Sequence, residues 1–170
     1  AVLRKITSIA VALLMLQGLT EADDLSAPEL ESLIISPRRV DVSVRGAEIT
    51  FTARITDDLS GNAQSFIRFT SPGGDQFVDS NWYDPTSGSR LDGTYETTVT
   101  VPQFSESGRW TATWYYTRDV VGNSASYQGA AAVDQLRSKG HPFFFTVGSG
   151  SSSVETATVI GQGLVEGGGV

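Results

Sequence analysis

The sequence contains no cysteine and only one histidine, His141. A chain without cysteine has no disulfide bonds, no thiolate metal site, no cysteine nucleophile and no lipid-modified cysteine anchor. Zinc centres need several His or Cys ligands, so a single histidine also argues against a zinc site. The fold must therefore be stabilised by its hydrophobic core. A metal ion held by oxygen ligands is the one further source of stabilisation that this composition allows.

Basic residues are also few. Twelve lysines and arginines stand against 19 aspartates and glutamates, which leaves a net charge of −7 among 170 residues and a pI of about 4.6. Nucleic-acid binding calls for clustered Lys and Arg at phosphates, so we expect no nucleic-acid partner. Long apolar runs are scarce as well. The best of them, residues 6–16, is short for a membrane span, and we expect none in the mature chain.

The first residues have the pattern of a secretory signal peptide. Arg4 and Lys5 precede the apolar run, and the small residues Thr20 and Ala22 precede a predicted cleavage before Asp23. We therefore predict a signal-peptide helix over residues 1–22 and a linker over residues 23–28. The alternative is a buried N-terminal helix. The expected location is secreted, either extracellular or at the cell surface, with the periplasm as an alternative.

Apolar and polar residues alternate with a period of two along several segments, which is typical of half-buried strands. The clearest are residues 47–56, with Ile49 and Phe51 inward, and residues 109–117. In the second, the residues expected to face the core are Trp110, Ala112, Trp114 and Tyr116. The other candidate strands are residues 33–35, 40–44, 64–70, 76–78, 94–101, 124–128 and 143–147.

Short strands separated by turns every 8–12 residues or so predict an all-β fold. We expect an immunoglobulin-like antiparallel β-sandwich of about seven to nine strands over residues 29–147, with a barrel or jelly roll as the alternative. One short helix is predicted over residues 130–137, with Ala132, Val133 and Leu136 inward. Residues 148–170 are rich in glycine and serine and are predicted to be a tail or linker.

Four short pieces of sequence carry a family resemblance. They are residues 55–61, 92–95, 107–110 and 119–123. In this order and spacing they resemble bacterial extracellular immunoglobulin-like domains over residues 29–147. The resemblance implies a spacer or binding module of an adhesin, a secreted multidomain enzyme or a surface protein, and it implies calcium at loop carboxylates in some members. The long polar loop over residues 79–93 departs from a generic spacer.

Strand directions predict that the acidic loops meet at one pole. If successive strands run up and down, the residues expected there are Asp57, Asp58, Asp79, Asp84, Asp92, Asp119 and Asn123. Calcium takes six to eight oxygen ligands from such loops. We therefore predict a metal site at Asp57 and Asp119, with Asp58 or Asn123 assisting. The alternative is that these residues cap turns through their own backbone, and no EF-hand or nonapeptide pattern is present.

Trp82 and Tyr83 lie in the predicted polar loop. An exposed aromatic pair of this kind could stack on a sugar ring or bind a protein partner, so the two residues form a predicted ligand-binding site. The alternative is that they cover an open end of the sandwich. Trp110 and Trp114 are expected in the core instead.

Signals for catalysis are weak. The only histidine has no Gly-x-Ser-x-Gly nucleophile motif to act with, and no phosphate-binding glycine loop is present. We expect a non-catalytic binding or structural module, in adhesion or as an accessory domain, with calcium as its cofactor and a protein or carbohydrate partner at the cell surface. The alternative is a small secreted hydrolase or carbohydrate-binding module that uses the acidic pole with Trp82 and Tyr83.

Overall fold

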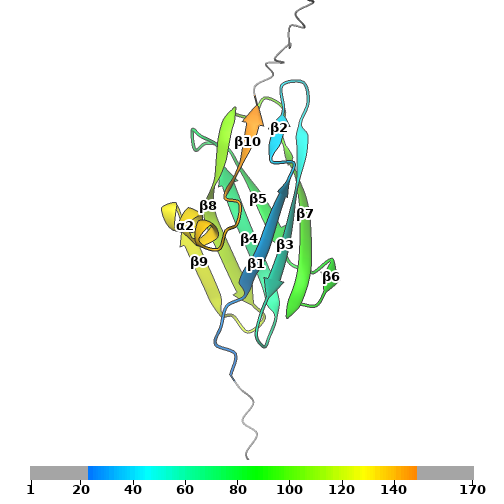
Figure 1. The fold of residues 1–170 in the computed structure, drawn as a ribbon, viewed down its shortest axis with the longest axis vertical. Helices are drawn as coiled ribbons and strands as arrows, with labels where there is room; N and C mark the ends of the chain where they lie inside the picture. Colours follow the sequence, from blue (N-terminus) through cyan, green and yellow to red (C-terminus); the bar gives the residue numbers. More distant parts are fainter. Residues whose placement is uncertain (1–22, 149–170) are drawn as a thin grey trace, which may run out of the picture.

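The structure of the protein, a computed structural model, describes residues 23–148. The predicted signal peptide and the predicted tail, apart from Gly148, lie outside the described residues. Within the described part, the strands form two sheets that run along the long axis of the molecule (Figure 1). The prediction of an all-β fold is confirmed at this level.

The first sheet has four strands in the order β1-β3-β7-β6, and all of its pairs are antiparallel. Its strands are β1 (Glu29–Ser36), β3 (Ala47–Thr56), β7 (Asp92–Val101) and β6 (Ser87–Gly88). The strand predicted over residues 47–56 has the observed bounds of β3. Its inward residues Ile49, Phe51, Ala53 and Ile55 are buried, because alternation places them all on one side of the strand.

The second sheet has the order β2-β10-β8-β4-β5, with β9 also pairing with β8. Its strands are β2 (Arg39–Asp41), β10 (Phe144–Gly148), β8 (Gly108–Asp119), β4 (Asn62–Thr70), β5 (Phe77–Trp82) and β9 (Ser124–Gln128). The pair of β2 and β10 is parallel and the other pairs are antiparallel. The chain passes from the first sheet to the second at Pro37, because proline cannot donate to a ladder and ends a strand.

The only helix of the described chain is α2 (Ala130–Ser138), close to the predicted bounds. Ala132 and Leu136 are fully buried, whereas Val133 is half-buried. β9 pairs with residues 114–118 of β8, and β10 pairs with residues 108–111 of the same strand. The helix therefore lies between two segments of one sheet edge.

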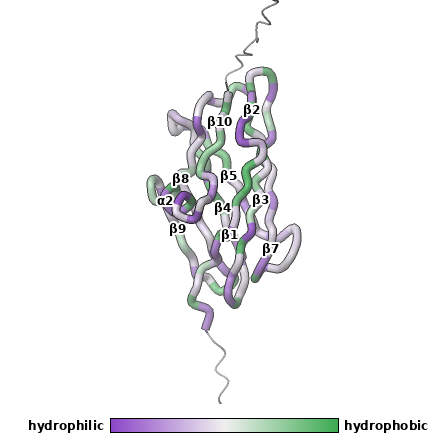
Figure 2. Tube along the Cα trace, viewed as in Figure 1, coloured by the Kyte–Doolittle hydropathy of each residue, from purple (hydrophilic) through white to green (hydrophobic). Residues whose placement is uncertain are grey.

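Aromatic rings from both sheets meet in one core. Phe51 of β3 stacks on Phe69 of β4 at a centroid distance of 5.2 Å, and Phe145 lies 5.6 Å from Phe69 and 5.7 Å from Trp110. All four side chains are buried. Such pairs add to the stabilisation that comes from burying large apolar surfaces. In Figure 2 hydrophobic segments run along β1 and β10, and hydrophilic ones lie where the described chain begins.

The alternation along β8 changes phase at Thr113. Phe69 pairs with Ala112 while Arg68 pairs with Trp114, so Thr113 is an extra residue opposite a single step of β4. A bulge of this kind moves every later side chain of the strand to the opposite side of the sheet. After the bulge, the buried residues of β8 are Tyr115, Thr117 and Asp119.

The prediction that Trp114 and Tyr116 face the core is therefore wrong. Both are half-buried on the outer side of the second sheet, where Phe66 packs against them with centroid distances of 4.8 and 5.6 Å. The part of the prediction that precedes the bulge is confirmed, since Trp110 and Ala112 are each 1% exposed.

Candidate functional site

Three segments meet at the pole where β3 and β8 end. The backbone nitrogen of Val120 donates to the oxygen of Gly61 at 3.0 Å, and that of Asn62 donates to the oxygen of Arg90 at 2.8 Å. The loop after β3, the turn after β8 and the segment before β7 therefore lie against one another. The structure brings together the loops that strand direction places at this pole.

Asp119 uses both of its carboxylate oxygens within a single turn, which ends at Asn123. One carboxylate oxygen of Asp119 accepts hydrogen bonds from the backbone nitrogens of Gly122 at 2.5 Å and Asn123 at 2.8 Å. The other accepts from the side-chain nitrogen of Asn123 at 2.6 Å. Asp119 is 1% exposed. This is the capping geometry of the alternative interpretation, in which the carboxylate satisfies backbone donors of its own turn.

Asp57 and Asp58 lie beside a third carboxylate, that of Asp24. Each of the three residues offers an oxygen, and these oxygens lie within 4.8 Å of one another. Asp24 belongs to the predicted linker over residues 23–28 and is not among the predicted site residues. The carboxylate of Asp24 accepts from the backbone nitrogen of Ser60 at 2.8 Å, and its backbone oxygen accepts from the side chain of Asn123 at 2.9 Å. The linker is thus attached to two loops of the pole.

The carboxylate of Asp57 is satisfied on one side only. Its Oδ1 accepts from the backbone nitrogens of Leu59 at 3.2 Å and Gly61 at 2.6 Å. Its Oδ2 is buried and has no hydrogen-bond partner among the described residues. Hydrogen bonds from Ser60 lower the pKa of Asp24, which keeps that carboxylate ionised at neutral pH. Adjacent carboxylate oxygens of this kind suit a hard cation.

A buried polar layer lies beneath these loops. The hydroxyl of Ser65 donates to the side-chain oxygen of Asn62 at 2.7 Å and lies 2.9 Å from the hydroxyl of Thr117. The side-chain nitrogen of Asn62 and the hydroxyl of Tyr95 are buried without a partner in the described part of the chain. Burial raises the pKa of Tyr95. Buried groups of this type are commonly satisfied by ordered water.

The other predicted members of the acidic pole form ion pairs with arginines. These pairs are Arg68–Asp79 at 2.7 Å, Arg90–Asp84 at 2.5 Å and Arg54–Asp92 at 2.7 Å. Asp79 does not lie in a loop, because β5 continues to Trp82. The prediction that a polar loop begins at Asp79 is wrong. Arg68 on the neighbouring strand pairs with Asp79, and this allows an acidic residue within a strand.

Trp82 and Tyr83 lie on different sides of the second sheet. Trp82 is 1% exposed, and its indole nitrogen lies 3.4 Å from the backbone oxygen of Phe51. Tyr83 is 51% exposed, with its hydroxyl 3.5 Å from the side-chain nitrogen of Gln64. The two rings therefore do not form a joint binding surface. The prediction of an exposed aromatic pair is therefore wrong for Trp82, which is part of the hydrophobic core.

The single histidine joins the segment after α2 to β1. Nε2 of His141 lies 3.0 Å from the backbone oxygen of Leu30, at hydrogen-bonding distance. Lys139 pairs nearby with Glu29 at 3.3 Å. This is a structural contact between the two sheets, since the ring contacts a backbone oxygen rather than a serine or a carboxylate.

Within residues 23–148, no helix has the length and apolar character that crossing a membrane requires. No protein-family model, curated protein or solved structure matches the chain.

Proposed function

We propose that the chain is a non-catalytic immunoglobulin-like module of a secreted or cell-surface protein, with a binding or structural role in adhesion or as an accessory domain. The strand order supports this proposal. Immunoglobulin domains place strands A-B-E-D in one sheet and G-F-C in the other, with C′ added in variable-type domains. The orders β1-β3-β7-β6 and β10-β8-β4-β5 correspond to these sequences of strands. The chain differs from the immunoglobulin strand order after β8, where α2 separates two short strands, β9 and β10, that both pair with β8.

The observation that carries the structural role is the position of the two ends of the described chain. Residue 23 enters at the acidic pole, and β10 ends at the opposite end of the long axis (Figure 1). A module of this shape can be joined to its neighbours in a line. Tension applied at the two ends would pull the parallel strands β2 and β10 in opposite directions along their length. The hydrogen bonds of this pairing would then share the load with the one that the backbone nitrogen of Thr146 donates, at 2.9 Å, to the backbone oxygen of Arg38 just before β2.

Four carboxylates, among them Asp24 and Asp92, support this role rather than that of a general acid in a hydrolase. Hydrogen bonds lower the pKa values of Asp24, Asp41 and Glu106, and Arg54 lowers that of Asp92. A glycosidase needs a general acid whose pKa is raised, so that it still carries a proton near neutral pH. Groups with lowered values are suited to hydrogen bonding and ion pairing instead.

Calcium is the cofactor of the proposed module. The oxygens of Asp24, Asp57 and Asp58 would supply the ligands, and the free Oδ2 of Asp57 supports this choice. Asp119 is left out of this ligand set, because both of its carboxylate oxygens accept hydrogen bonds within its own turn. Asn123 is left out as well, because its side-chain nitrogen joins this turn to the backbone oxygen of Asp24. Calcium would offset two of the three negative charges and attach the entering segment to the first loop.

The structural role can be tested by force spectroscopy on the full chain. One series has tethers at residues 23 and 148, which loads β2 and β10 in shear. The control series has tethers at Gly74 and residue 148, which lie at the same pole. Pulling from one pole opens the strands one hydrogen bond at a time instead of loading them in shear. We expect clearly higher unfolding forces in the first series, since forced unfolding depends on the barrier along the pulling direction. Equal or lower forces would contradict a load-bearing role.

A further inference from the structure

The outer side of the second sheet carries a group of aromatic residues that we call the aromatic face. It consists of Phe66, Phe77, Tyr83, Trp114 and Tyr116. Phe66 is only 9% exposed although it lies outside the hydrophobic core, because Trp114 and Tyr116 cover it. Phe77 and Tyr83 are 55% and 51% exposed. The face therefore has a packed centre and open rings at its margin.

The outer side of the first sheet differs in composition. The outward residues of β3 and β7 are mostly threonines and glutamates, among them Glu48, Thr50, Glu96 and Thr98, and none is aromatic. Solvent-facing positions of a sheet are ordinarily polar in this way. Exposed rings gathered over one sheet therefore indicate an interaction surface.

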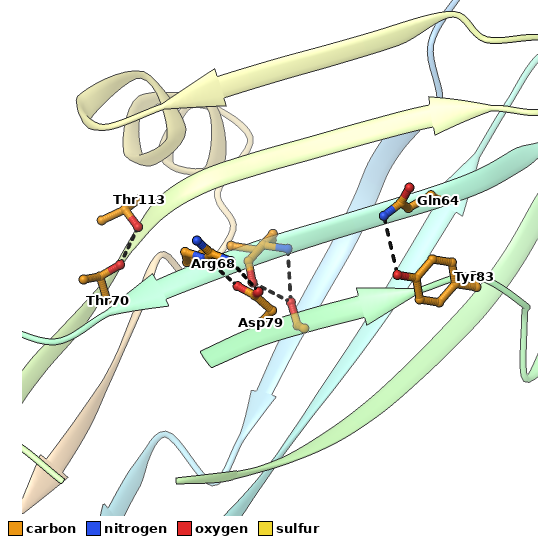
Figure 3. A network of polar contacts seen from close by, with 8 residues as sticks. Gln64, Arg68, Thr70, Asp79, Tyr83 and Thr113 are labelled. Atoms are coloured by element: carbon orange, nitrogen blue, oxygen red, sulfur yellow. Dashed lines mark hydrogen bonds and ion pairs between the residues drawn. The ribbon is translucent and has the colours of Figure 1, made fainter. Parts of the chain in front are cut away.

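The aromatic face is also a cationic region of an acidic protein. The guanidinium of Arg68 lies 3.9 Å from the ring centre of Phe77 and 5.6 Å from that of Trp114, while it pairs with Asp79 (Figure 3). Arg109 and Arg118 are exposed on the same side of the sheet and form no ion pair within the described residues. On the outer side of β4, β5 and β8, three arginines thus stand against one aspartate, in a chain of net charge −7.

Polar groups separate the rings from one another. The outward residues of β4 are Gln64, Phe66, Arg68 and Thr70 in turn. Gln64 contacts the hydroxyl of Tyr83, and Thr70 lies 2.6 Å from the hydroxyl of Thr113 (Figure 3). The core of a protein–protein interface is a more continuous apolar area. Alternating rings and hydrogen-bonding groups instead match a sugar chain, which presents apolar C–H faces and hydroxyl groups in alternation.

We propose that the aromatic face binds an acidic polysaccharide, a polymer of sugars that carry carboxylates. Exposed rings would stack on the C–H faces of the sugars, and Arg109 and Arg118 would pair with the carboxylates. Phe77 and Tyr83 lie six residues apart on the same side of β5 and its extension, which spans about 20 Å. An extended polymer can contact both rings. This inference rests on the binding side of the proposed function and names its ligand.

The test is calorimetric titration of the full chain with polygalacturonate at low and high salt. The control ligand is the same polymer with its carboxylates methyl-esterified. We expect binding to polygalacturonate that weakens as salt rises, and much weaker binding to the ester. Phe77→Ala and Tyr83→Ala should each weaken binding roughly three- to tenfold. Arg118→Gln should weaken it as well, whereas Arg45→Gln, an exposed arginine away from the face, should leave it unchanged.

The substituted side chains are all exposed, so circular dichroism should show folded variants. Absence of binding by the folded wild-type chain would overturn the inference, as would equal binding by Phe77→Ala, Tyr83→Ala and Arg118→Gln. Self-association that these variants abolish would assign the face to a second copy of the chain instead. Failure here would leave the load-bearing role intact, because that role is measured independently by force.

Discussion

The side-chain nitrogen of Asn123 donates to the carboxylate of Asp119 at 2.6 Å and to the backbone oxygen of Asp24 at 2.9 Å. One amide group therefore joins the turn after β8 to a segment 99 residues earlier in the chain. Asp119 holds the turn in the shape that presents this amide. The acidic pole therefore depends on the buried turn cap of Asp119 as well as on the carboxylates of its loops.

Asp119→Ala should lower the free energy of unfolding by about 2–4 kcal/mol, because it leaves two backbone donors and the Asn123 amide without their acceptor. Urea unfolding measures this loss. The control is Asp75→Ala, an exposed aspartate at the opposite pole, which should change stability by less than about 0.5 kcal/mol. Equal stability of the two variants would contradict the capping role.

Trp110→Ala and Trp114→Ala should differ in their cost. Trp110 is buried in the core, so its removal should cost about 3–5 kcal/mol. Trp114 lies on the outer side beyond the bulge and should cost about 1–2 kcal/mol. Denaturant unfolding of both variants tests the change of phase at Thr113. Similar losses would indicate that both rings lie in the core and would contradict a bulge at Thr113.

Acid should remove the stabilisation that comes from the pair of Arg54 and Asp92. The hydrogen bond from Arg54 lowers the pKa of Asp92 below its ordinary value of 3.8. The stabilisation is thus fully present above that value and is lost as the pH falls through the lower, folded-state pKa. Melting temperatures recorded from about pH 5 to pH 2 should fall less steeply for Asp92→Asn than for the wild type. Arg54→Gln should flatten the profile in the same way, and an unchanged slope in both would contradict the assignment.

Alkali should destabilise the protein through Tyr115. Burial raises the pKa of this phenol above its ordinary value of 10.0. The stabilisation from the neutral buried ring is present below that value and declines as the pH rises above it, because the unfolded chain ionises more easily. Tyr115→Phe should lose less stability than the wild type between about pH 9 and pH 11. Equal alkaline losses in Tyr115→Phe and in the wild type would contradict the assignment.

Calcium should raise the melting temperature of the chelator-treated chain in a concentration-dependent manner, since a ligand that binds only the folded state stabilises it. Asp57→Asn and Asp24→Asn should abolish the rise, and Asp75→Asn should retain it. Absence of any rise in the wild type would return the three carboxylates to turn capping. A rise that persists in Asp57→Asn would place the ion elsewhere.

Much of the strand pattern could be predicted because alternation is a local property of the chain. Residues 47–56 have unbroken alternation, and the observed strand has the same bounds. The bulge at Thr113 could not be predicted in this way. It is a property of the pairing between β4 and β8, and Trp114 looks like a core residue until the partner strand is known.

The site was partly predictable for a similar reason. Strand direction alone brings the loops of Asp57 and Asp119 to one pole. Asp24 was missed because its segment has no periodicity, and its partners lie 36 and 99 residues away. The sequence places Trp82 in a loop because Asp79 and Asn81 precede it, and both residue types are uncommon in strands. In the structure Asp79 is accommodated in β5 by its ion pair with Arg68, so the strand continues to Trp82.

The position of α2 has a consequence for how the chain behaves among other copies. β1 and β9 are edge strands, and an uncovered edge offers a row of backbone groups to any extended chain. The helix packs on β8 and β9, and the segment after it contacts β1 through His141 and Lys139. The helix and the segment after it therefore lie against strands on this flank of the molecule, which should hinder edge-to-edge aggregation.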